Sequence, residues 1–506
     1  MDWFKLDRPA LRRFGLLAAG SLIYVLPIVL ADRYYQDDLA RSLYGATGWA
    51  GDGRPLTEWV MQLLSGGQAT IVDLYPLPLF LGVAILAYAM TLYARQAFPA
   101  WKDSALLTVA LGLVVAQPFA MANLSYRFDS LTMLLALALC FVLYALSPAL
   151  GGPKLAIAGA VAAMLVMGLY QPASGMFLVL AGIWLVFWLL DWLGGTKPLR
   201  GQLPALWTEV WRLGGVGAGA LVYLLAIAPR FVDSEGWRQE ASQTVSGTDA
   251  LGKLVTNTLS AAYYIRERMR MAPLLYRIFL VLAVAGAVLF SLWQFLRSSK
   301  SGIGRKVLGC IVILGAPFGM LFVSYMPLIV LQNMDCSARM FLAYGGTLLF
   351  ISLLWLRALP RRRVLAGVLL GGFLFCQSSY IYAYGTALKS QKAYETYLVT
   401  QIAHDCEPIN GAGNYKQLSF VGTAPRPREV QMICSQYPFF SELIQPCFTN
   451  STWLGGAWVY HYLQYDLEIV GLTDQDNAAC VDENLLTQNS RYACYESGEK
   501  ILVAFR

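Results

Sequence analysis

The chain has 506 residues, of which 57% are hydrophobic and only 14% are charged, and its formal net charge is +7. Soluble domains carry about 25% charged residues, so this composition excludes an ordinary soluble enzyme. It also excludes a disordered chain, which needs low hydrophobicity and high net charge. Apolar runs near the roughly 20 residues that cross a bilayer recur along the sequence, and they do not alternate as barrel strands do. We therefore predict a polytopic α-helical membrane protein.

Eleven membrane-spanning helices are predicted from these runs. They cover residues 14–31, 72–94, 104–120, 130–148, 155–170, 174–194, 213–229, 274–295, 307–326, 340–356 and 364–385. Loops on one side are rich in Lys and Arg, such as Arg12 and Arg13 before the first span. Because cytoplasmic loops carry this excess, we expect the N-terminus in the cytoplasm and the C-terminal segment outside it. If 155–170 and 174–194 were one broken helix, that segment would change sides.

Charge is divided unevenly along the chain. Residues 387–506 hold 8 Lys and Arg against 13 Asp and Glu, whereas residues 1–386 hold 30 against 18. A basic surplus on a membrane domain is typical of loop orientation and headgroup contact, so we expect membrane lipid, and no nucleic acid, as a partner. The sequence therefore predicts a transmembrane domain over 1–386 and a small water-facing domain over 387–506.

Two long loops of the transmembrane domain are expected on the outer face, together with the tail. The first covers 32–71 and the second 230–273. Within the second loop, residues 249–272 have the pattern of an amphipathic helix with a basic end, which is typical of a helix lying on a membrane surface. A solvated helix packed on its own protein has the same pattern. Chemistry is therefore expected on the outer face.

Two adjacent carboxylates, Asp37 and Asp38, lie just beyond the outer end of the first span. Like charges held this close tend to raise one pKa, and such a carboxylate suits a general base that takes a proton from an attacking hydroxyl. Arg41, one helical turn away, and Arg54, in a glycine-rich turn, can each bind a phosphate. The alternative is structural, because both carboxylates could cap a short interfacial helix and pair with Arg41.

Three further polar groups lie at the expected outer ends of spans. Arg127 and Asp129 form the first, and a charge pair at membrane depth is by default a functional site, although an interfacial ion pair has the same spacing. Tyr170 and Gln171 can read sugar hydroxyls, but Tyr is also a common interface anchor. Arg339 can meet an anionic headgroup or a lipid-linked phosphate.

Several enzyme classes lack their signature in this chain. The two histidines, His404 and His461, make a histidine-based zinc or di-metal site unexpected. There is no Walker-type phosphate loop, no Gly-x-Ser-x-Gly elbow and no dinucleotide fingerprint. Outside the cytoplasm an enzyme would also lack nucleotides. We therefore expect no metal, no cofactor and an activated donor anchored in lipid.

The tail has the pattern of a small α/β domain. Helical patterns cover 387–405 and 452–464, and strand-like patterns cover 417–422, 491–496 and 500–505. Ser497-Gly498-Glu499-Lys500 predicts a hairpin turn.

Cysteines concentrate in this tail, at Cys406, Cys434, Cys447, Cys480 and Cys494. Outside the cytoplasm such thiols should pair. Cys434 with Cys447 and Cys480 with Cys494 close the shortest loops and are the predicted disulfides. Cys406 would then pair with Cys336 or stay reduced. The alternative is a set of inert, buried thiols in a cytoplasmic domain.

The outer-loop motifs occur in a fixed order within residues 34–172. Tyr35 to Arg41 reads Tyr-x-Asp-Asp-x-x-Arg, and Gly48 to Leu56 reads Gly-x-x-x-x-Gly-Arg-Pro-Leu. They are followed by Asp73-Leu74-Tyr75-Pro76-Leu77-Pro78, Ser125-Tyr126-Arg127-Phe128-Asp129-Ser130 and Tyr170-Gln171. In this order the motifs resemble the GtrII-type glucosyltransferases that modify lipopolysaccharide O-antigen, which are membrane glycosyltransferases of the GT-C class.

The resemblance implies a GT-C-like fold and the inverting transfer of a hexose, with glucose favoured, from undecaprenyl phosphate to an acceptor hydroxyl. The acceptor would be O-antigen or another surface glycan, at the periplasmic face of a bacterial inner membrane. Asp37 or Asp38 would be the base. By their chemistry, the candidates for the donor phosphate are Arg41, Arg54, Arg127 and Arg339, and those for sugar or acceptor are Tyr35, Asp129, Tyr170 and Gln171. The alternative from another class is a non-catalytic translocator or binding scaffold for lipid-linked sugars.

Overall fold

The computed structural model of the chain describes residues 4–146, 150–196, 198–232, 236–358, 363–411, 413–450, 458 and 467–506. The chain forms two compact units. The first comprises residues 1–26, 48–67 and 74–380, and the second comprises 27–47, 68–73 and 381–506. Helix α16, Arg363–Ile409, runs through the predicted boundary between residues 386 and 387. The division into a transmembrane domain and a tail therefore stays a prediction.

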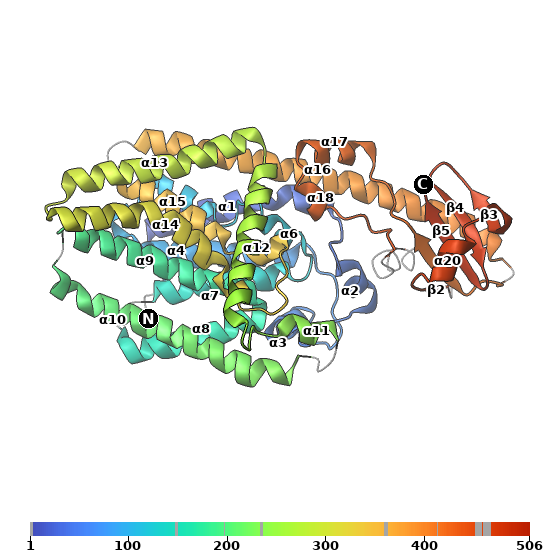
Figure 1. Cartoon of the computed structure of the whole chain (residues 1–506), viewed down its shortest axis with the longest axis horizontal. Coiled ribbons are helices and arrows are strands. Elements are labelled where there is room, and N and C mark those ends of the chain that lie inside the picture. The colour runs from blue at the N-terminus through green and yellow to red at the C-terminus, as the bar shows by residue number, and fades with distance from the viewer. Residues whose placement is uncertain are drawn as a thin grey trace. The chain divides into compact units, whose positions relative to one another are not determined.

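The first unit is built of helices (Figure 1). Its long helices, of which α1 and α16 continue into the second unit, are α1 (Arg8–Ala31), α4 (Leu77–Ala97), α7 (Ser130–Ala145), α8 (Gly152–Tyr170), α9 (Gly175–Leu193), α10 (Leu199–Val222), α12 (Ala250–Met271), α13 (Leu274–Ser298), α14 (Ile303–Ile329), α15 (Tyr344–Ala358) and α16. Shorter elements are α3 (Pro55–Leu64), α5 (Ala105–Gly112), α6 (Ala120–Ser125), α11 (Trp237–Ser242), the 3-10 turns η1 (Pro99–Trp101), η3 (Gln171–Ser174), η5 (Ala228–Arg230) and η6 (Ala338–Phe341), and the π turn η4 (Tyr223–Ile227).

Eight helical segments among the described residues are long and apolar enough to cross a membrane, which indicates a membrane protein as predicted. They are Arg8–Ala31, Leu77–Ala97, Gly152–Leu193, Leu199–Arg230, Leu274–Ser298, Ile303–Ile329, Ala338–Ala358 and Val364–Ile409. The predicted number of eleven is not confirmed.

Four of the predicted spans account for the difference, because two are not among the eight segments and two are merged into one. In the predicted span 104–120, the helix α5 ends at Gly112 and the next helix, α6, begins only at Ala120. Residues 113–134 are all buried. Helix α7, in the predicted span 130–148, has 16 residues. The predicted spans 155–170 and 174–194 form one 42-residue segment in which η3 interrupts the helix. An apolar run buried in protein has the same hydropathy as one that faces lipid, so hydropathy alone does not fix the number of spans.

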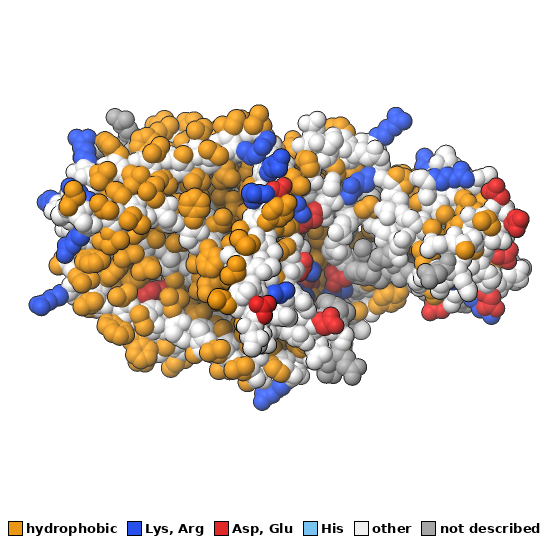
Figure 2. All heavy atoms as spheres, in the orientation of Figure 1, with side chains coloured by type: hydrophobic (Ala, Val, Ile, Leu, Met, Phe, Trp, Pro, Cys, Tyr) orange, Lys and Arg blue, Asp and Glu red, His pale blue; other side chains and the backbone are white. Residues whose placement is uncertain are grey.

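The surface of the first unit carries the apolar side chains that a bilayer requires. On α13, Ile278, Val281, Leu282 and Leu289 are exposed. Figure 2 shows hydrophobic side chains covering α9, α10, α13 and α14, with Lys and Arg gathered where α13 connects to α14. This separation is typical of helices whose sides face lipid and whose ends face water.

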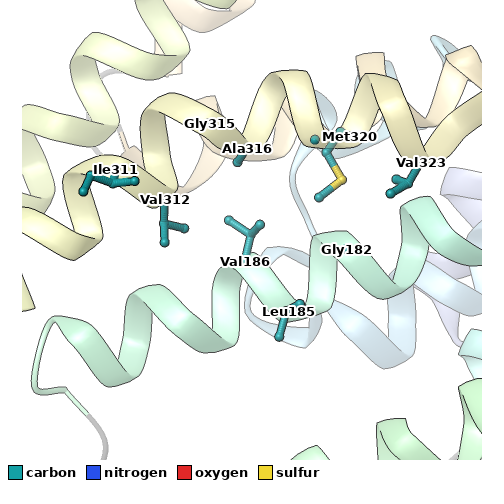
Figure 3. Close-up of a pocket in the computed structure, with 10 residues that line it drawn as sticks. Gly182, Leu185, Val186, Ile311, Val312, Gly315, Ala316, Met320 and Val323 are labelled. Atoms are coloured by element: carbon teal, nitrogen blue, oxygen red, sulfur yellow. The ribbon is translucent and has the colours of Figure 1, made fainter. Parts of the chain in front are cut away.

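A groove of about 310 Å³ lies between α9 and α14 (Figure 3). Its lining is entirely apolar and includes Gly182, Gly315 and Gly319, whose missing side chains leave the space open. Such a lining suits hydrocarbon chains, whereas sugar hydroxyls and phosphates need polar partners. The candidate site for chemistry therefore lies elsewhere.

Helix α12 forms where the amphipathic helix was predicted over 249–272, and in Figure 1 it runs crosswise to α13 and α14. One face is packed on the protein, since Asn257 donates from Nδ2 to the carbonyl of Ile329 at 2.9 Å. The other face exposes Leu251, Val255 and Leu259 at intervals of four residues. The helix thus has a packed face and an apolar exposed face, and binding to a membrane surface stays a prediction.

The second unit contains a five-stranded sheet in the order β2-β1-β5-β4-β3. The strands are β1 (Gln417–Val421), β2 (Glu468–Ile469), β3 (Leu485–Gln488), β4 (Tyr492–Ser497) and β5 (Lys500–Phe505). Strand β1 pairs in parallel with β2 and β5, while β4 is antiparallel to β3 and β5. Short helices are α2 (Asp38–Tyr44), α17 (Arg428–Gln436), α18 (Phe440–Leu443), α20 (Asp474–Ala479) and η7 (Asp482–Asn484).

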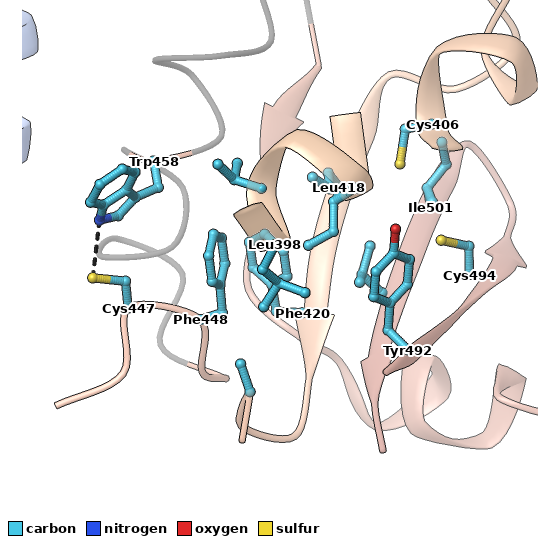
Figure 4. Close-up of a cluster of buried hydrophobic side chains, with 14 of the residues drawn as sticks. Leu398, Cys406, Leu418, Phe420, Cys447, Phe448, Trp458, Tyr492, Cys494 and Ile501 are labelled. Atoms are coloured by element: carbon cyan, nitrogen blue, oxygen red, sulfur yellow. Dashed lines mark hydrogen bonds between the residues drawn. The ribbon is translucent and has the colours of Figure 1, made fainter. Parts of the chain in front are cut away.

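Most of the predicted tail elements are confirmed. Strands β1, β4 and β5 occupy the three strand-like segments, and Gly498, with φ of +62°, makes the predicted turn between β4 and β5. The helical pattern over 387–405 lies in α16, whose Leu398, Ile402 and Cys406 pack on the sheet in one buried cluster (Figure 4). The pattern over 452–464 lies outside the described residues, except for Trp458.

A buried ion pair holds the start of the first loop in the second unit. The Arg33 guanidinium binds both carboxylate oxygens of Glu395 on α16, each at 3.0 Å. The same carboxylate accepts from Gln391 Nε2 and from the amide of Cys447, both at 2.9 Å. Both charged side chains are almost fully buried, so each needs the other to offset the cost of losing water.

The predicted disulfides Cys434–Cys447 and Cys480–Cys494 are absent from the structure, in which none of the nine cysteines is bridged. Cys447 Sγ instead accepts a hydrogen bond from Trp458 Nε1 at 3.0 Å (Figure 4). Cys480 Sγ donates to the carbonyl of Asp476 at 3.6 Å. Chain spacing selected these pairs, but tertiary packing gives their members other neighbours.

Asp476, the N3 residue of α20, joins that helix to the β4–β5 hairpin. Its carboxylate accepts from Lys500 Nζ at 2.8 Å, from Ser497 Oγ at 3.0 Å and, in a capping box, from the amide of Thr473 at 2.7 Å. Burial alone would raise the pKa of Asp476, but the hydrogen bonds from Lys500, Thr473 and Ser497 lower it to about 2. The folded state therefore favours the ionised carboxylate.

We expect Asp476→Asn to destabilise the tail by about 2 kcal/mol near pH 7. Because the folded pKa is depressed, this contribution is present above the unfolded pKa of about 4 and is lost as the pH falls toward 2. Urea midpoints for cleavage within the tail, measured on the full chain with thermolysin near pH 7 and pepsin near pH 2, test this. Asp482→Asn, at an exposed position, is the control. An equal penalty at both pH values would contradict the assignment.

Candidate functional site

The motif over 48–56 folds into a tight turn that leads into α3. The carbonyl of Trp49 accepts hydrogen bonds from the amides of Asp52 at 3.1 Å and Arg54 at 2.8 Å. Pro55 occupies the first position of α3, where a missing N–H leaves no hydrogen bond unmade. The Arg-Pro-Leu part of the motif thus marks the point where the turn ends and the helix begins.

Gly53 sets the shape of this turn. Its φ is +70°, and an added Cβ would lie 3.1 Å from Cγ2 of Val232. The Gly53 carbonyl accepts from Gln171 Nε2 and from the hydroxyl of Tyr223, both at 2.8 Å. The predicted sugar-binding residue Gln171 therefore uses its amide nitrogen to hold the turn, and its contact with a sugar stays a prediction.

Arg54 lies between two carboxylates. Its guanidinium binds Asp129 at 3.2 Å and Asp52 at 2.9 Å, and Asp52 also pairs with Arg238 at 2.8 Å. The indole of Trp49 donates to the other oxygen of Asp129 at 2.8 Å. Although burial lowers it, the pKa of Arg54 is raised overall by Asp129 and Asp52. Arg54 stays charged, but its two carboxylate partners balance that charge and the side chain holds the turn in place. Arg54 is therefore a weaker candidate for binding a phosphate than the sequence indicated.

Arg339 is the most open of the predicted phosphate-binding arginines in the first unit. Its backbone carbonyl accepts from the hydroxyl of Tyr170 at 2.7 Å and from Asn123 Nδ2 at 3.1 Å, which fixes η6. Its guanidinium donates to the hydroxyl of Tyr126 at 2.8 Å. The side chain is 45% exposed, compared with 15% for Arg54. Arg339 can therefore reach a ligand without losing a buried carboxylate partner.

Arg127 is mostly buried, and its guanidinium lies over the ring of Tyr75, 4.3 Å from the ring centre. A cation over an aromatic face is stabilised by the ring's negative charge density. Two of the motifs that resemble the family thus meet through this stack, although Tyr75 and Arg127 are 52 residues apart in the chain. Asp129, from the same motif, binds Arg54 instead.

A second groove, of about 580 Å³, follows α12. Its lining combines aromatic, charged and apolar side chains: Leu259, Ser260, Tyr263, Tyr264, Glu267, Arg268, Met271 and Cys336. Tyr264 stacks on Phe341 of η6 with ring centres 5.0 Å apart, and Arg268 lies 4.5 Å above the Tyr264 ring. This lining, unlike that of the groove between α9 and α14, can accept an anionic and partly apolar ligand.

The two carboxylates predicted as candidates for the general base, Asp37 and Asp38, lie in the second unit. They differ in exposure and in hydrogen-bond partners. Asp38 is fully buried and accepts a hydrogen bond from the amide of Tyr35 at 3.2 Å. Asp37 is 31% exposed and pairs with Arg41 at 2.5 Å, while Arg41 also donates to backbone carbonyls of the following turn. Asp37 therefore forms the ion pair with Arg41 that the structural alternative predicted. The Arg41 guanidinium is engaged by this carboxylate and by backbone carbonyls.

Sequence reasoning did not nominate several residues that build this region. Glu58 accepts from the amides of Gly48 and Ala50 at 3.2 and 3.1 Å, and its place in the first turn of α3 was a usable signal. Arg238 had no signal, because its partner Asp52 is far away in sequence. In the described part of the chain, no group of three or more His, Cys, Asp and Glu side chains is placed to hold a metal ion.

Comparisons with known proteins agree with the motifs. A protein of Salmonella phage P22, described as an uncharacterized 55.3 kDa protein in the gtrB 5′ region, is 25% identical over 472 residues, which cover 89% of this chain and 91% of the phage protein. No solved structure matches the chain significantly. The family model for glucosyl transferase GtrII matches residues 26–350, well over half of the sequence. The chain therefore belongs to the GtrII glucosyltransferase family.

Proposed function

We propose that this protein transfers a hexose, with glucose favoured, from undecaprenyl phosphate to a hydroxyl of lipopolysaccharide O-antigen or another surface glycan. The family match over 26–350 carries this proposal, because it includes both the Asp37–Asp38 turn and the residues around Arg54 and Arg339. Transfer takes place at the periplasmic face of a bacterial inner membrane, in a GT-C-like fold, with the N-terminus in the cytoplasm and the tail in the periplasm. This orientation requires α8 and α9, which η3 separates, to cross the membrane as two spans.

The chemistry is an inverting displacement in a single step. The acceptor oxygen attacks the anomeric carbon, the bond between that carbon and the phosphate oxygen breaks, and undecaprenyl phosphate leaves. A carboxylate takes the proton of the attacking hydroxyl, which is the role of a general base. No atom changes its oxidation state in this displacement, so the proposal requires no redox cofactor.

Asp37 is the better candidate for the base, because exposure and orientation both favour it. Its carboxylate is partly exposed and held in one direction by Arg41, so an acceptor hydroxyl can reach it. Asp38 is fully buried and holds the turn through the amide of Tyr35. We therefore assign Asp38 to positioning and Asp37 to proton transfer.

Arg339 is the best candidate for the donor phosphate. A guanidinium binds a phosphate through charge-assisted hydrogen bonds that are stronger than neutral ones. The side chain is nearly half exposed, and the adjoining groove along α12 brings Arg268 and aromatic rings next to the same segment. Arg127 stays a second candidate, and Arg41 and Arg54 are assigned to holding their turns.

Asp37→Asn should lower the turnover number about 10²–10⁴-fold, the usual loss when a positioned general base is removed. Asp38→Asn keeps an oxygen for the amide of Tyr35 and should cost less. Both variants should remain folded, and Asp482→Asn serves as the control. Initial rates with a polyprenyl-phosphate hexose and purified glycan measure the effect. Normal turnover in Asp37→Asn would refute its role, and normal turnover in both would remove the carboxylate pair from the mechanism.

Arg339→Ala should raise the KM for the lipid-linked donor at least tenfold and leave the KM for the glycan acceptor nearly unchanged, since phosphate is the donor's strong charge. Arg339→Lys should restore part of the donor affinity. Arg297→Ala, in α13, removes an exposed arginine outside the site and should have no effect. If Arg339→Ala leaves donor KM at the wild-type value, the phosphate binds elsewhere, and Arg127→Ala then becomes the decisive variant.

A further inference from the structure

Two buried cysteines of the tail lie on elements that pack against each other. Cys406 is near the C-terminal end of α16, and Cys494 is in the middle of β4. Both side chains are fully buried and belong to the same hydrophobic cluster. The helix presents Leu398, Ile402 and Cys406 to this cluster at intervals of four residues, which places them on one face.

Hydrogen bonds to Asp405 fix the register of the helix end against the strand. The Asp405 carboxylate accepts from the hydroxyl of Tyr492 at 2.7 Å and from Asn489 Nδ2 at 3.3 Å. Residues 492 and 494 lie on the same face of β4, since side chains alternate along a strand. The residue after Asp405 is therefore held opposite Cys494.

Figure 4 shows the outcome of this register: the Cys406 and Cys494 side chains face the same gap, one from the helix end and one from the strand. A hydrogen bond that the Cys494 thiol donates to Cys406, together with burial, raises the pKa of the Cys494 thiol. A thiol of raised pKa is a poor nucleophile. Because both side chains are fully buried, an external oxidant reaches this pair before the core closes, while the tail is still folding.

We propose that Cys406 and Cys494 form a disulfide that joins the end of α16 to β4. The inference rests on the periplasmic tail of the proposed function. An external disulfide oxidant supplies the chemistry: one cysteine thiolate attacks it to give a mixed disulfide, and the second then displaces the oxidant's sulfur. One S–S bond forms in the chain, the oxidant's S–S bond becomes two thiols, and the two electrons pass to the oxidant.

Thiol counting on the full chain, isolated from membranes, denatured and alkylated without reduction, tests the proposal. We expect seven of the nine cysteines to be alkylated, and all nine after reduction. Peptide mapping should find the segments around Cys406 and Cys494 joined, two hydrogens lighter than the two thiol peptides. Nine alkylated cysteines, or a bond between any other pair, would overturn the proposal.

Single variants keep the test decisive. Cys406→Ala leaves eight cysteines, all of which should be alkylated without reduction because Cys494 has lost its partner. Cys480→Ala also leaves eight, of which six should be alkylated, and so is the matched control. Equal counts for the two variants would contradict the pairing. Hexose transfer, assayed on the same wild-type sample, separates the two proposals: transfer without the disulfide refutes the pairing alone, and the disulfide without transfer refutes the function alone.

Discussion

A buried guanidinium needs a counter-charge, and beside the turn of residues 48–53 that guanidinium belongs to Arg54. Its two carboxylates come from different places, Asp52 from the same turn and Asp129 from the start of α7. Removing one partner from such a buried pair typically costs 3–5 kcal/mol, because an unpaired charge stays behind. The ion pair therefore fixes where the turn of residues 48–53 lies on the helices, and the hydrogen bonds of Gly53 and Trp49 depend on that placement.

The division of roles among the arginines follows from this constraint. Arg54 and Arg41 have carboxylate partners at close range and are mostly buried, so a ligand would have to displace those partners. Arg339 is held through its backbone carbonyl by Tyr170 and Asn123, and its guanidinium contacts the Tyr126 hydroxyl and the exposed Asp335, 4.0 Å away. Positioning through the backbone keeps the charge available, which is what recognition of a phosphate requires.

Local patterns predicted much of the fold and of the candidate site, whereas long-range contacts escaped them. The strands near Gln417, Tyr492 and Lys500 and the turn at Gly498 could be read because alternation and turn chemistry are local. Hydropathy could not separate the buried stretch after α5 from a lipid-facing span. Chain spacing paired Cys434 with Cys447 and Cys480 with Cys494, but these cysteines are unbridged in the structure, because the neighbours of each thiol depend on long-range packing such as that of α16 on β4. Arg238 and Arg33 were missed for the same reason.

The central claim is inverting hexose transfer from a lipid-linked donor, and the anomeric configuration of the product tests it most directly. Purified protein would be incubated with undecaprenyl-phosphate glucose of known configuration and O-antigen glycan, and the new linkage would be assigned by NMR from its anomeric coupling constants. The account predicts donor consumption and a product linkage of the opposite configuration. A product that retains the donor's configuration would contradict the single displacement, and no consumption of any polyprenyl-phosphate hexose would contradict the claim as a whole.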